Sequence, residues 1–166
     1  MELAAERFIE KMGMLFEADG ASRTAGRLMG LLMLSAEPHS LEELAERLRV
    51  SKASVSTNAR ALERYGTIER VTRPGDRRDY YQIADAMPAH LTARRIEHLT
   101  RMRDLISGTC PTEPAGGPVQ ERLESFASFF EAMIRAMDGA RDQWLARERG
   151  TGTDGAASGG GLRALR

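Results

Sequence analysis

Residues 40–80 constrain the fold more than any other part of this sequence. Their hydrophobic periodicity predicts a short amphipathic helix, a tight turn and a second helix. Two short runs typical of strands, about residues 67–72 and 80–83, follow and are separated by a turn that contains Pro74 and Gly75. This order of elements is that of a helix-turn-helix with a β-wing, an architecture typical of DNA-binding regulators. We therefore expect a mainly α-helical protein with a small β-wing.

Local signals indicate where the two helices of this stretch begin. Ser40 and Glu43 form the Ser-x-x-Glu pattern of a capping box, in which each side chain accepts a hydrogen bond from the backbone amide of the other residue. We expect the first helix to span residues 41–48. Ser51 is the expected N-cap of the second helix, which should run from about residue 52 to 65.

The second helix is predicted to have one apolar face and one face of short polar side chains. Val55, Ala59 and Leu62 recur at helical spacing and should point inward. The opposite face lacks the glutamate–lysine ladder of an ordinary solvated helix, and short polar groups would let it lie deep in a DNA major groove. A Ser/Thr-rich surface helix of modest helix propensity is the alternative. The residues that we expect to contact DNA from this helix and its cap are Ser51, Lys52, Ala53, Ser54, Ser56, Thr57, Asn58, Arg60 and Arg64.

The predicted wing brings three arginines to one turn. Arg73, Arg77 and Arg78 surround the Pro-Gly pair, and three guanidinium groups directly after a candidate recognition helix favour phosphate contact or insertion into a minor groove. A single arginine there would be read as part of a solvated loop. Asp76 is a poor neighbour for DNA, so we expect it to support the wing by holding an arginine, with Arg78 as the better candidate.

The charge of the chain is distributed unevenly. Residues 47–78 carry nine basic and three acidic side chains, whereas the formal net charge of the 166 residues is +0. Such asymmetry is expected when one face meets nucleic acid. The single cysteine is consistent with a reducing cytosol, and the sequence has neither the basic and apolar pattern of a signal peptide nor an apolar run long enough for a membrane span. We expect a cytoplasmic protein.

Amphipathic segments flank residues 40–80 on both sides. Apolar periodicity predicts helices at about residues 2–17, 25–35, 88–107 and 119–146, and Gly26 and Gly30 would let another backbone approach the second of these closely. A Pro- and Gly-rich linker precedes the last helix, and the Gly- and Ser-rich C-terminal end predicts disorder. The predicted organisation is therefore a winged helix-turn-helix domain at 1–107, a C-terminal dimerisation helix at 119–147 and a disordered tail at 148–166. Both terminal helices are expected to mediate dimerisation, through Phe8, Met12, Leu123, Phe126, Phe130, Met133 and Met137.

The order of these elements, together with the block SKASVSTNARALERYG and the wing sequence GDRRDYY, resembles the MarR superfamily. Within it, the recognition-helix block and the N-terminal segment resemble the GbsR-type branch. The resemblance covers about residues 8–106 and implies a homodimer whose recognition helices enter successive major grooves of a pseudopalindromic double-stranded operator, about 34 Å apart. It also implies a repressor whose DNA affinity changes when a small-molecule effector binds near the junction of the dimer helices and the DNA-binding lobe. For the GbsR-type branch the resemblance suggests a choline-like effector, which would require an aromatic cage.

Other functional classes find less support in the sequence. The three histidines lie in different segments without cysteine or carboxylate ligands at metal-binding spacing, and no phosphate-binding loop or nucleophile motif is present, so we expect no enzyme, no cofactor and no metal site. A thiol-based redox sensor acting through Cys110 is one alternative, although no neighbouring cation in the sequence would lower the pKa of that thiol. A winged helix that binds only proteins is the other.

Overall fold

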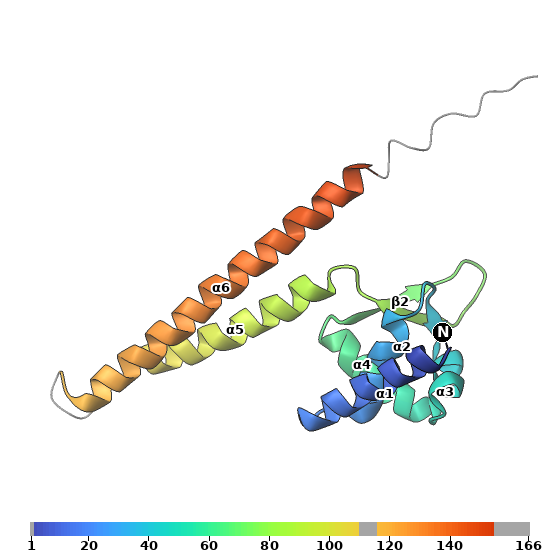
Figure 1. Cartoon of the computed structure of the whole chain (residues 1–166), viewed down its shortest axis with the longest axis horizontal. Helices are drawn as coiled ribbons and strands as arrows, with labels where there is room; N and C mark the ends of the chain where they lie inside the picture. Colours follow the sequence, from blue (N-terminus) through green and yellow to red (C-terminus); the bar gives the residue numbers. More distant parts are fainter. Residues whose placement is uncertain (1, 110–115, 155–166) are drawn as a thin grey trace, which may run out of the picture. The chain divides into compact units, whose positions relative to one another are not determined.

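The computed structural model of this chain describes residues 2–109 and 116–154. Their fold confirms the predicted class, a mostly helical protein with a small sheet and the arrangement of a winged helix (Figure 1). The chain divides into two compact units, residues 1–91 and 92–166, so the boundary falls inside one helix. None of the helices in the described part is long and apolar enough to cross a membrane. In chain order the elements are α1 (Glu2–Ala18), α2 (Arg23–Met33), β1 (His39–Ser40), α3 (Leu41–Leu48), α4 (Lys52–Arg64), β2 (Ile68–Thr72), β3 (Asp79–Ile83), α5 (Met87–Ser107) and α6 (Pro118–Asp154).

Helices α1 and α2 pack closely because α2 presents two glycines to α1. A Cβ atom at Gly26 would lie 2.4 Å from the carbonyl oxygen of Met12, and one at Gly30 would lie 3.1 Å from the Cβ of Met12. The predicted close approach of another backbone is therefore confirmed, and α1 is the partner. Ser22 caps α2 by accepting a hydrogen bond from the amide of Ala25, and α2 begins two residues earlier than the sequence pattern indicated.

The core of the first unit lies where α2 meets α3 and α4. Leu28, Leu44 and Val55 have no exposed surface, and Ala59 and Leu62 complete the inner face of α4 as predicted. Burial of this apolar surface is the main force that holds the two helices of the helix-turn-helix against α2.

The helix-turn-helix has the predicted caps. In the capping box of α3, the Ser40 amide donates to the Glu43 carboxylate at 2.8 Å, and the Glu43 amide donates to the Ser40 hydroxyl at 3.3 Å. The Ser51 hydroxyl accepts from the amide of Ser54 at the start of α4. Because these bonds are local, they define where each helix begins without help from the rest of the fold.

The wing is one hairpin of a three-stranded antiparallel sheet with the strand order β1-β3-β2. Strand β3 pairs with β2 from Ile68 opposite Ile83 to Thr72 opposite Asp79, and with β1 through Ser40 opposite Tyr80. The sequence pattern did not indicate β1, because a two-residue strand shows no period of its own and is defined only by pairing with β3. As a result, the residue that caps α3 also belongs to the sheet that carries the wing.

The second unit consists of α5 from Thr92 onward and α6, which form a helical hairpin (Figure 1). Arg103 of α5 donates a hydrogen bond to Glu131 of α6, and Leu99 and Ile134 are buried. Helix α6 continues to Asp154, so the tail predicted as disordered from residue 148 is helical over its first part. The remaining tail residues, 155–166, lie outside the described parts of the chain.

Candidate nucleic-acid interface

Helix α4 presents an exposed stripe on the side opposite the core. Ala53, Thr57, Arg60 and Arg64 are exposed and recur at the spacing of one helical face. The N-terminal half of this stripe carries methyl groups and one hydroxyl, and the C-terminal half carries two guanidinium groups. We call these four residues the α4 stripe.

Several of the polar side chains predicted to contact DNA are engaged within α4 itself. The Asn58 amide nitrogen donates to the Ser54 carbonyl oxygen at 2.8 Å, and Arg60 donates to the Ser56 hydroxyl at 2.8 Å. Asn58 is thus turned toward its own helix, which is a common local bond for this residue type. DNA contact by Asn58 stays a prediction, and it would require this local hydrogen bond to break or be shared. Lys52 forms an ion pair with Glu42 of α3, and Ser51 serves as the cap.

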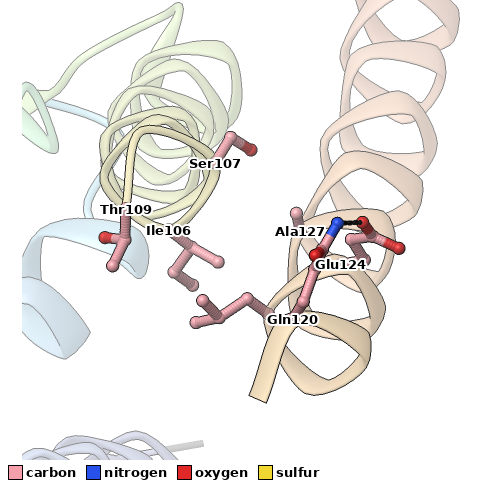
Figure 2. A pocket seen from close by; sticks show the side chains of 7 residues that line it. Ile106, Ser107, Thr109, Gln120, Glu124 and Ala127 are labelled. Carbon is pink, nitrogen blue, oxygen red and sulfur yellow. Dashed lines mark hydrogen bonds between the residues drawn. The ribbon is translucent and has the colours of Figure 1, made fainter. Parts of the chain in front are cut away.

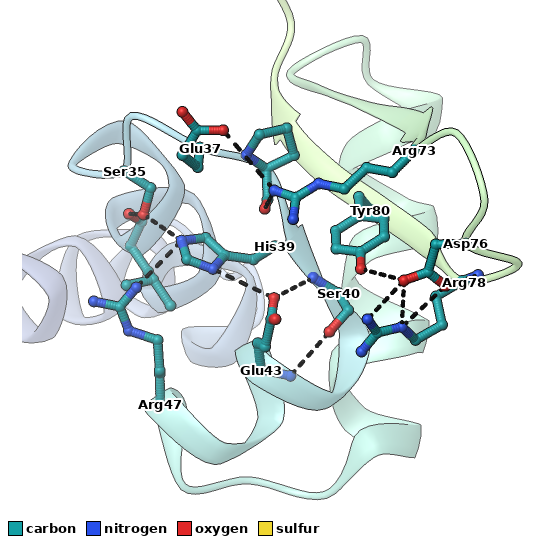
Figure 3. A network of polar contacts seen from close by, with 12 residues as sticks. Ser35, Glu37, His39, Ser40, Glu43, Arg47, Arg73, Asp76, Arg78 and Tyr80 are labelled. Atoms are coloured by element: carbon teal, nitrogen blue, oxygen red, sulfur yellow. Dashed lines mark hydrogen bonds and ion pairs between the residues drawn. The ribbon is translucent and has the colours of Figure 1, made fainter.

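A compact polar network supports the wing (Figure 3). Asp76 accepts hydrogen bonds from the Arg78 guanidinium at 2.6 and 3.0 Å and from the Tyr80 hydroxyl at 2.7 Å. The pKa of the Asp76 carboxyl is well below its usual range, chiefly because the Arg78 side chain donates to it. The pairing of Asp76 with Arg78 that the sequence suggested is therefore present. Tyr80, whose side chain is almost fully buried, is the additional member that sequence reasoning missed.

Arg73 is not part of a free arginine cluster at the wing tip. Its guanidinium donates to the carbonyl oxygen of Pro38 at 3.0 Å and lies 4.2 Å above the ring of Tyr80 (Figure 3). These interactions join the wing to the segment that leads into β1. Arg73 thus supports the wing, as Arg78 does through Asp76, and DNA contact by these arginines stays a prediction. Among residues 2–109 and 116–154, the exposed Arg77 side chain makes no hydrogen bond or ion pair, so it alone of the three is unengaged.

The different settings of Arg73 and Arg77 lead to different expected effects on DNA binding. Arg77→Ala should reduce the slope of log affinity against log salt by about one for each phosphate that the protein no longer neutralises. Arg73→Ala should weaken binding because the wing is no longer held by Pro38 and Tyr80, and it should leave that slope unchanged. Fluorescence anisotropy titrations of a labelled duplex between about 50 and 300 mM salt measure both values. Equal changes in slope for the two variants would contradict the assignment.

His39 lies between the end of α2 and α3, in strand β1 of the wing sheet. Its Nε2 lies 2.9 Å from the Ser35 hydroxyl and 3.2 Å from Arg47, and its Nδ1 lies 3.6 Å from the Glu43 carboxylate (Figure 3). Since a guanidinium can only donate, this geometry fits a neutral ring that accepts at Nε2. Burial lowers the pKa of His39, and the charge of Arg47 lowers it further.

The depressed pKa of His39 predicts that the fold loses stability as the pH falls. The unfolded chain takes up a proton at His39 near its ordinary pKa of 6.5, whereas the folded chain resists protonation, so stability is complete above that value and declines below it. Urea unfolding between about pH 7.5 and 5, above the carboxylate range, should show this decline. His39→Gln should flatten it, and the control His98→Gln should retain it because His98 is exposed. A His39→Gln curve parallel to the wild type would contradict the prediction.

The residues predicted for a dimer interface lie in different settings. Met12 packs on the core of its own unit, facing Gly30, and its part in a dimer interface stays a prediction. Phe8 is half-buried on α1. On α6, Phe126 and its neighbour Phe129 are 51% and 57% exposed, and Phe129 was not among the predicted interface residues. The other predicted positions on α6, Leu123, Phe130, Met133 and Met137, are half-buried.

The sequence did not indicate two pockets that the structure contains. The first, with a volume of about 500 Å³, lies within the first unit behind α4 and is almost entirely apolar. Sequence reasoning missed it because its wall combines residues that are far apart in the chain. Its lining residues are Phe16, Ala21, Ser22, Ala25, Met29, Asn58, Ala61, Leu62, Tyr65, Thr67 and Leu91.

The second pocket, of about 290 Å³, lies in the second unit between the C-terminal end of α5 and the N-terminal part of α6 (Figure 2). Ile106 and Leu123 give it an apolar side, and Gln120 and Glu124 form a hydrogen-bonded pair on α6. Cys110, the candidate redox residue, lies outside the described residues. The geometry therefore neither supports nor opposes the thiol-sensor alternative.

Comparisons with known proteins agree with this architecture. The model of the MarR family matches residues 24–80. The transcriptional regulator MmpR5 of Mycobacterium tuberculosis is 42% identical over 99 residues, which cover 59% of this chain and 60% of that protein. The transcriptional repressor OpcR of Bacillus subtilis is 31% identical over 83 residues, which cover 50% of this chain and 45% of that protein. The matched region thus spans less than two thirds of either relative.

A crystal structure of a transcriptional regulator is similar over a larger part of the chain. It is 32% identical in sequence, superposes with a TM-score of 0.73, and the match covers 86% of this chain and 99% of that one. These relatives are regulators, in agreement with the prediction that the chain is not an enzyme. The matching family model is that of the MarR family as a whole, so the GbsR-type branch stays a prediction.

Proposed function

Because this chain belongs to the MarR family, we propose that it is a cytoplasmic transcriptional repressor that binds a specific double-stranded DNA operator as a homodimer. One observation carries the proposal. The α4 stripe ends in Arg60 and Arg64, lies opposite the buried core face of α4 and is followed in the chain by a wing whose unengaged arginine is Arg77. A helix with short side chains at its N-terminal end and cations farther along fits a major groove with flanking phosphates.

Exposed apolar surface supports the homodimer part of the proposal. In the second unit Leu105 is 74% exposed, and Phe126 and Phe129 are more than half exposed. Large apolar side chains exposed on a helical hairpin usually mark an interface. A second copy of the hairpin would cover them, and a twofold dimer would place two α4 helices for a pseudopalindromic site.

Selection from random duplexes tests the proposed function. The full chain should enrich a single pseudopalindromic motif with half-sites about 10 base pairs apart, centre to centre. Sedimentation of the protein alone should give the mass of a dimer. Enrichment of no motif, with no salt-dependent binding of any duplex, would contradict DNA binding and favour a protein-interaction module.

We further infer that a small-molecule effector binds in the 500 Å³ pocket behind α4. Ala61 and Leu62 of α4 form part of its wall, so a ligand that displaces this wall would also displace the α4 stripe. No acidic or basic side chain lines it. The two aromatic rings, Phe16 and Tyr65, would have to bind a choline-like cation without a carboxylate, so a neutral apolar effector fits better.

Filling the pocket should remove effector binding. Ala61→Leu adds three carbon atoms to the wall and is expected to abolish the fluorescence enhancement of Nile red, a neutral apolar probe, while operator affinity without ligand stays within about threefold. Ala93→Leu, at an exposed position of α5, serves as the control and should bind the dye as the wild type does. Equal dye binding by both variants would place the apolar site elsewhere, and choline can be tested as a competitor in the same assay.

A further inference from the structure

The arrangement of side chains on α4 limits how this helix can read sequence. In a helix-turn-helix, the N-terminal residues of the recognition helix contact base edges, and later residues meet the DNA backbone. The N-terminal half of the α4 stripe consists of Ala53 and Thr57, one helical turn apart and both exposed. Arg60 and Arg64 occupy the half that would meet phosphates.

Several polar groups next to these two residues already take part in local hydrogen bonds. The Ser51 hydroxyl accepts from the Ser54 amide at 3.1 Å, the Ser56 hydroxyl accepts from Arg60 at 2.8 Å, and the Asn58 amide donates to the Ser54 carbonyl at 2.8 Å. Ser54 is half-buried. The surface that α4 offers to base edges is therefore richer in methyl groups than its Ser/Thr/Asn composition suggested.

Among the groups that base pairs display in the major groove, one is apolar. The C5-methyl group of thymine is the natural partner of alanine and threonine methyl groups, whereas the other positions present hydrogen-bond donors and acceptors. We propose that Ala53 and Thr57 are specificity-determining residues that recognise thymine C5-methyl groups in the operator. This proposal rests on the proposed function. Ser56 is then a positioning residue, because its hydroxyl holds the guanidinium of Arg60 beside the groove.

Replacing thymine with deoxyuridine tests the proposal, since this change removes the C5-methyl group and keeps the base pairing. In the operator obtained by selection, deoxyuridine at one or more conserved thymine positions should weaken binding of the full wild-type chain by about fourfold, the factor expected for one buried methyl-sized group. Anisotropy titrations at fixed salt give this ratio for each position.

Two substitutions at Thr57 separate its methyl group from its hydroxyl. Thr57→Ser removes the methyl group and should bind the thymine and deoxyuridine duplexes equally at the position that Thr57 contacts. Thr57→Val keeps a methyl group, removes the hydroxyl and should retain the ratio of about fourfold. Ala53→Gly should bind the thymine and deoxyuridine duplexes equally at the position that Ala53 contacts.

The opposite results would overturn the proposal. Specific binding of the selected duplex with no effect of deoxyuridine at any position would exclude methyl recognition and leave the proposed function intact. If Thr57→Val bound the thymine and deoxyuridine duplexes equally while Thr57→Ser still preferred the thymine duplex, the hydroxyl of Thr57 and not its methyl group would recognise the base. If both Thr57→Ser and Ala53→Gly still preferred the thymine duplexes about fourfold, other residues would recognise the methyl groups. Failure to bind any duplex specifically would instead overturn the proposed function, and methyl recognition with it.

Discussion

Replacing both Arg77 and Arg78 with glutamate is expected to reduce duplex affinity by more than about 100-fold at about 0.15 M salt. Arg77 is exposed and unengaged within the described chain, so its replacement removes a candidate phosphate ligand and introduces repulsion. Arg78→Glu also places a carboxylate beside Asp76, which breaks the network that supports the wing. Anisotropy titrations of the selected operator measure the decrease.

The control has the same change in charge at positions outside the proposed interface. Arg95→Glu combined with Arg122→Glu alters two exposed arginines of the second unit and should leave affinity within about threefold of the wild type. Arg77→Glu alone should retain most of the decrease seen in the double variant. If the control variant lost affinity as strongly, the effect would be one of overall charge, and the wing would have no special part in binding.

Gly26→Ala is expected to lower the free energy of unfolding by about 3 kcal/mol. The added Cβ would lie 2.4 Å from the carbonyl oxygen of Met12 and 2.8 Å from the side chain of Phe16, and a backbone atom cannot move aside without displacing α1 from α2. The gain in helix propensity from glycine to alanine, about 1 kcal/mol, is too small to offset this clash. Urea unfolding followed by circular dichroism measures the change.

Gly139→Ala is the matched control for this substitution. Gly139 lies within α6, and no heavy atom would come within 4 Å of an added Cβ there. The same chemical change should therefore raise stability by about 0.5–1 kcal/mol through helix propensity alone. Similar effects of the two substitutions, in either direction, would show that α1 and α2 are not in close contact at Gly26.

The parts of the fold that sequence could predict are those set by local chemistry. The caps at Ser40 and Ser51 and the apolar face of α4 all depend on residues within one or two turns of each other, and each lies where expected. The pairing of Asp76 with Arg78 is equally local. The hydrogen bond from Asn58 to its own helix is a local pattern too, and it could have been anticipated from the preference of asparagine for backbone carbonyls.

The parts that could not be predicted depend on contacts between distant residues. Arg73 reaches the carbonyl of Pro38, 35 positions away, so nothing next to Arg73 in the chain indicates that it supports the wing. The apolar pocket combines residues from Phe16 to Leu91, none of which forms a motif. The end of α6 was misplaced for another reason, because glycine-rich composition suggests disorder while helix propagation from a long amphipathic segment carries α6 to Asp154.

Comparing the affinity of the chain for the selected operator with its affinity for a scrambled duplex of the same composition shows whether α4 and the wing read DNA sequence. The full chain should bind the operator at least about 1,000-fold more tightly than the scrambled duplex at about 0.15 M salt. Both affinities should fall steeply as salt increases, because each complex depends on phosphate contacts. Equal affinity for the two duplexes, or binding that does not respond to salt, would contradict the account of α4 and the wing as a sequence-specific DNA-binding surface.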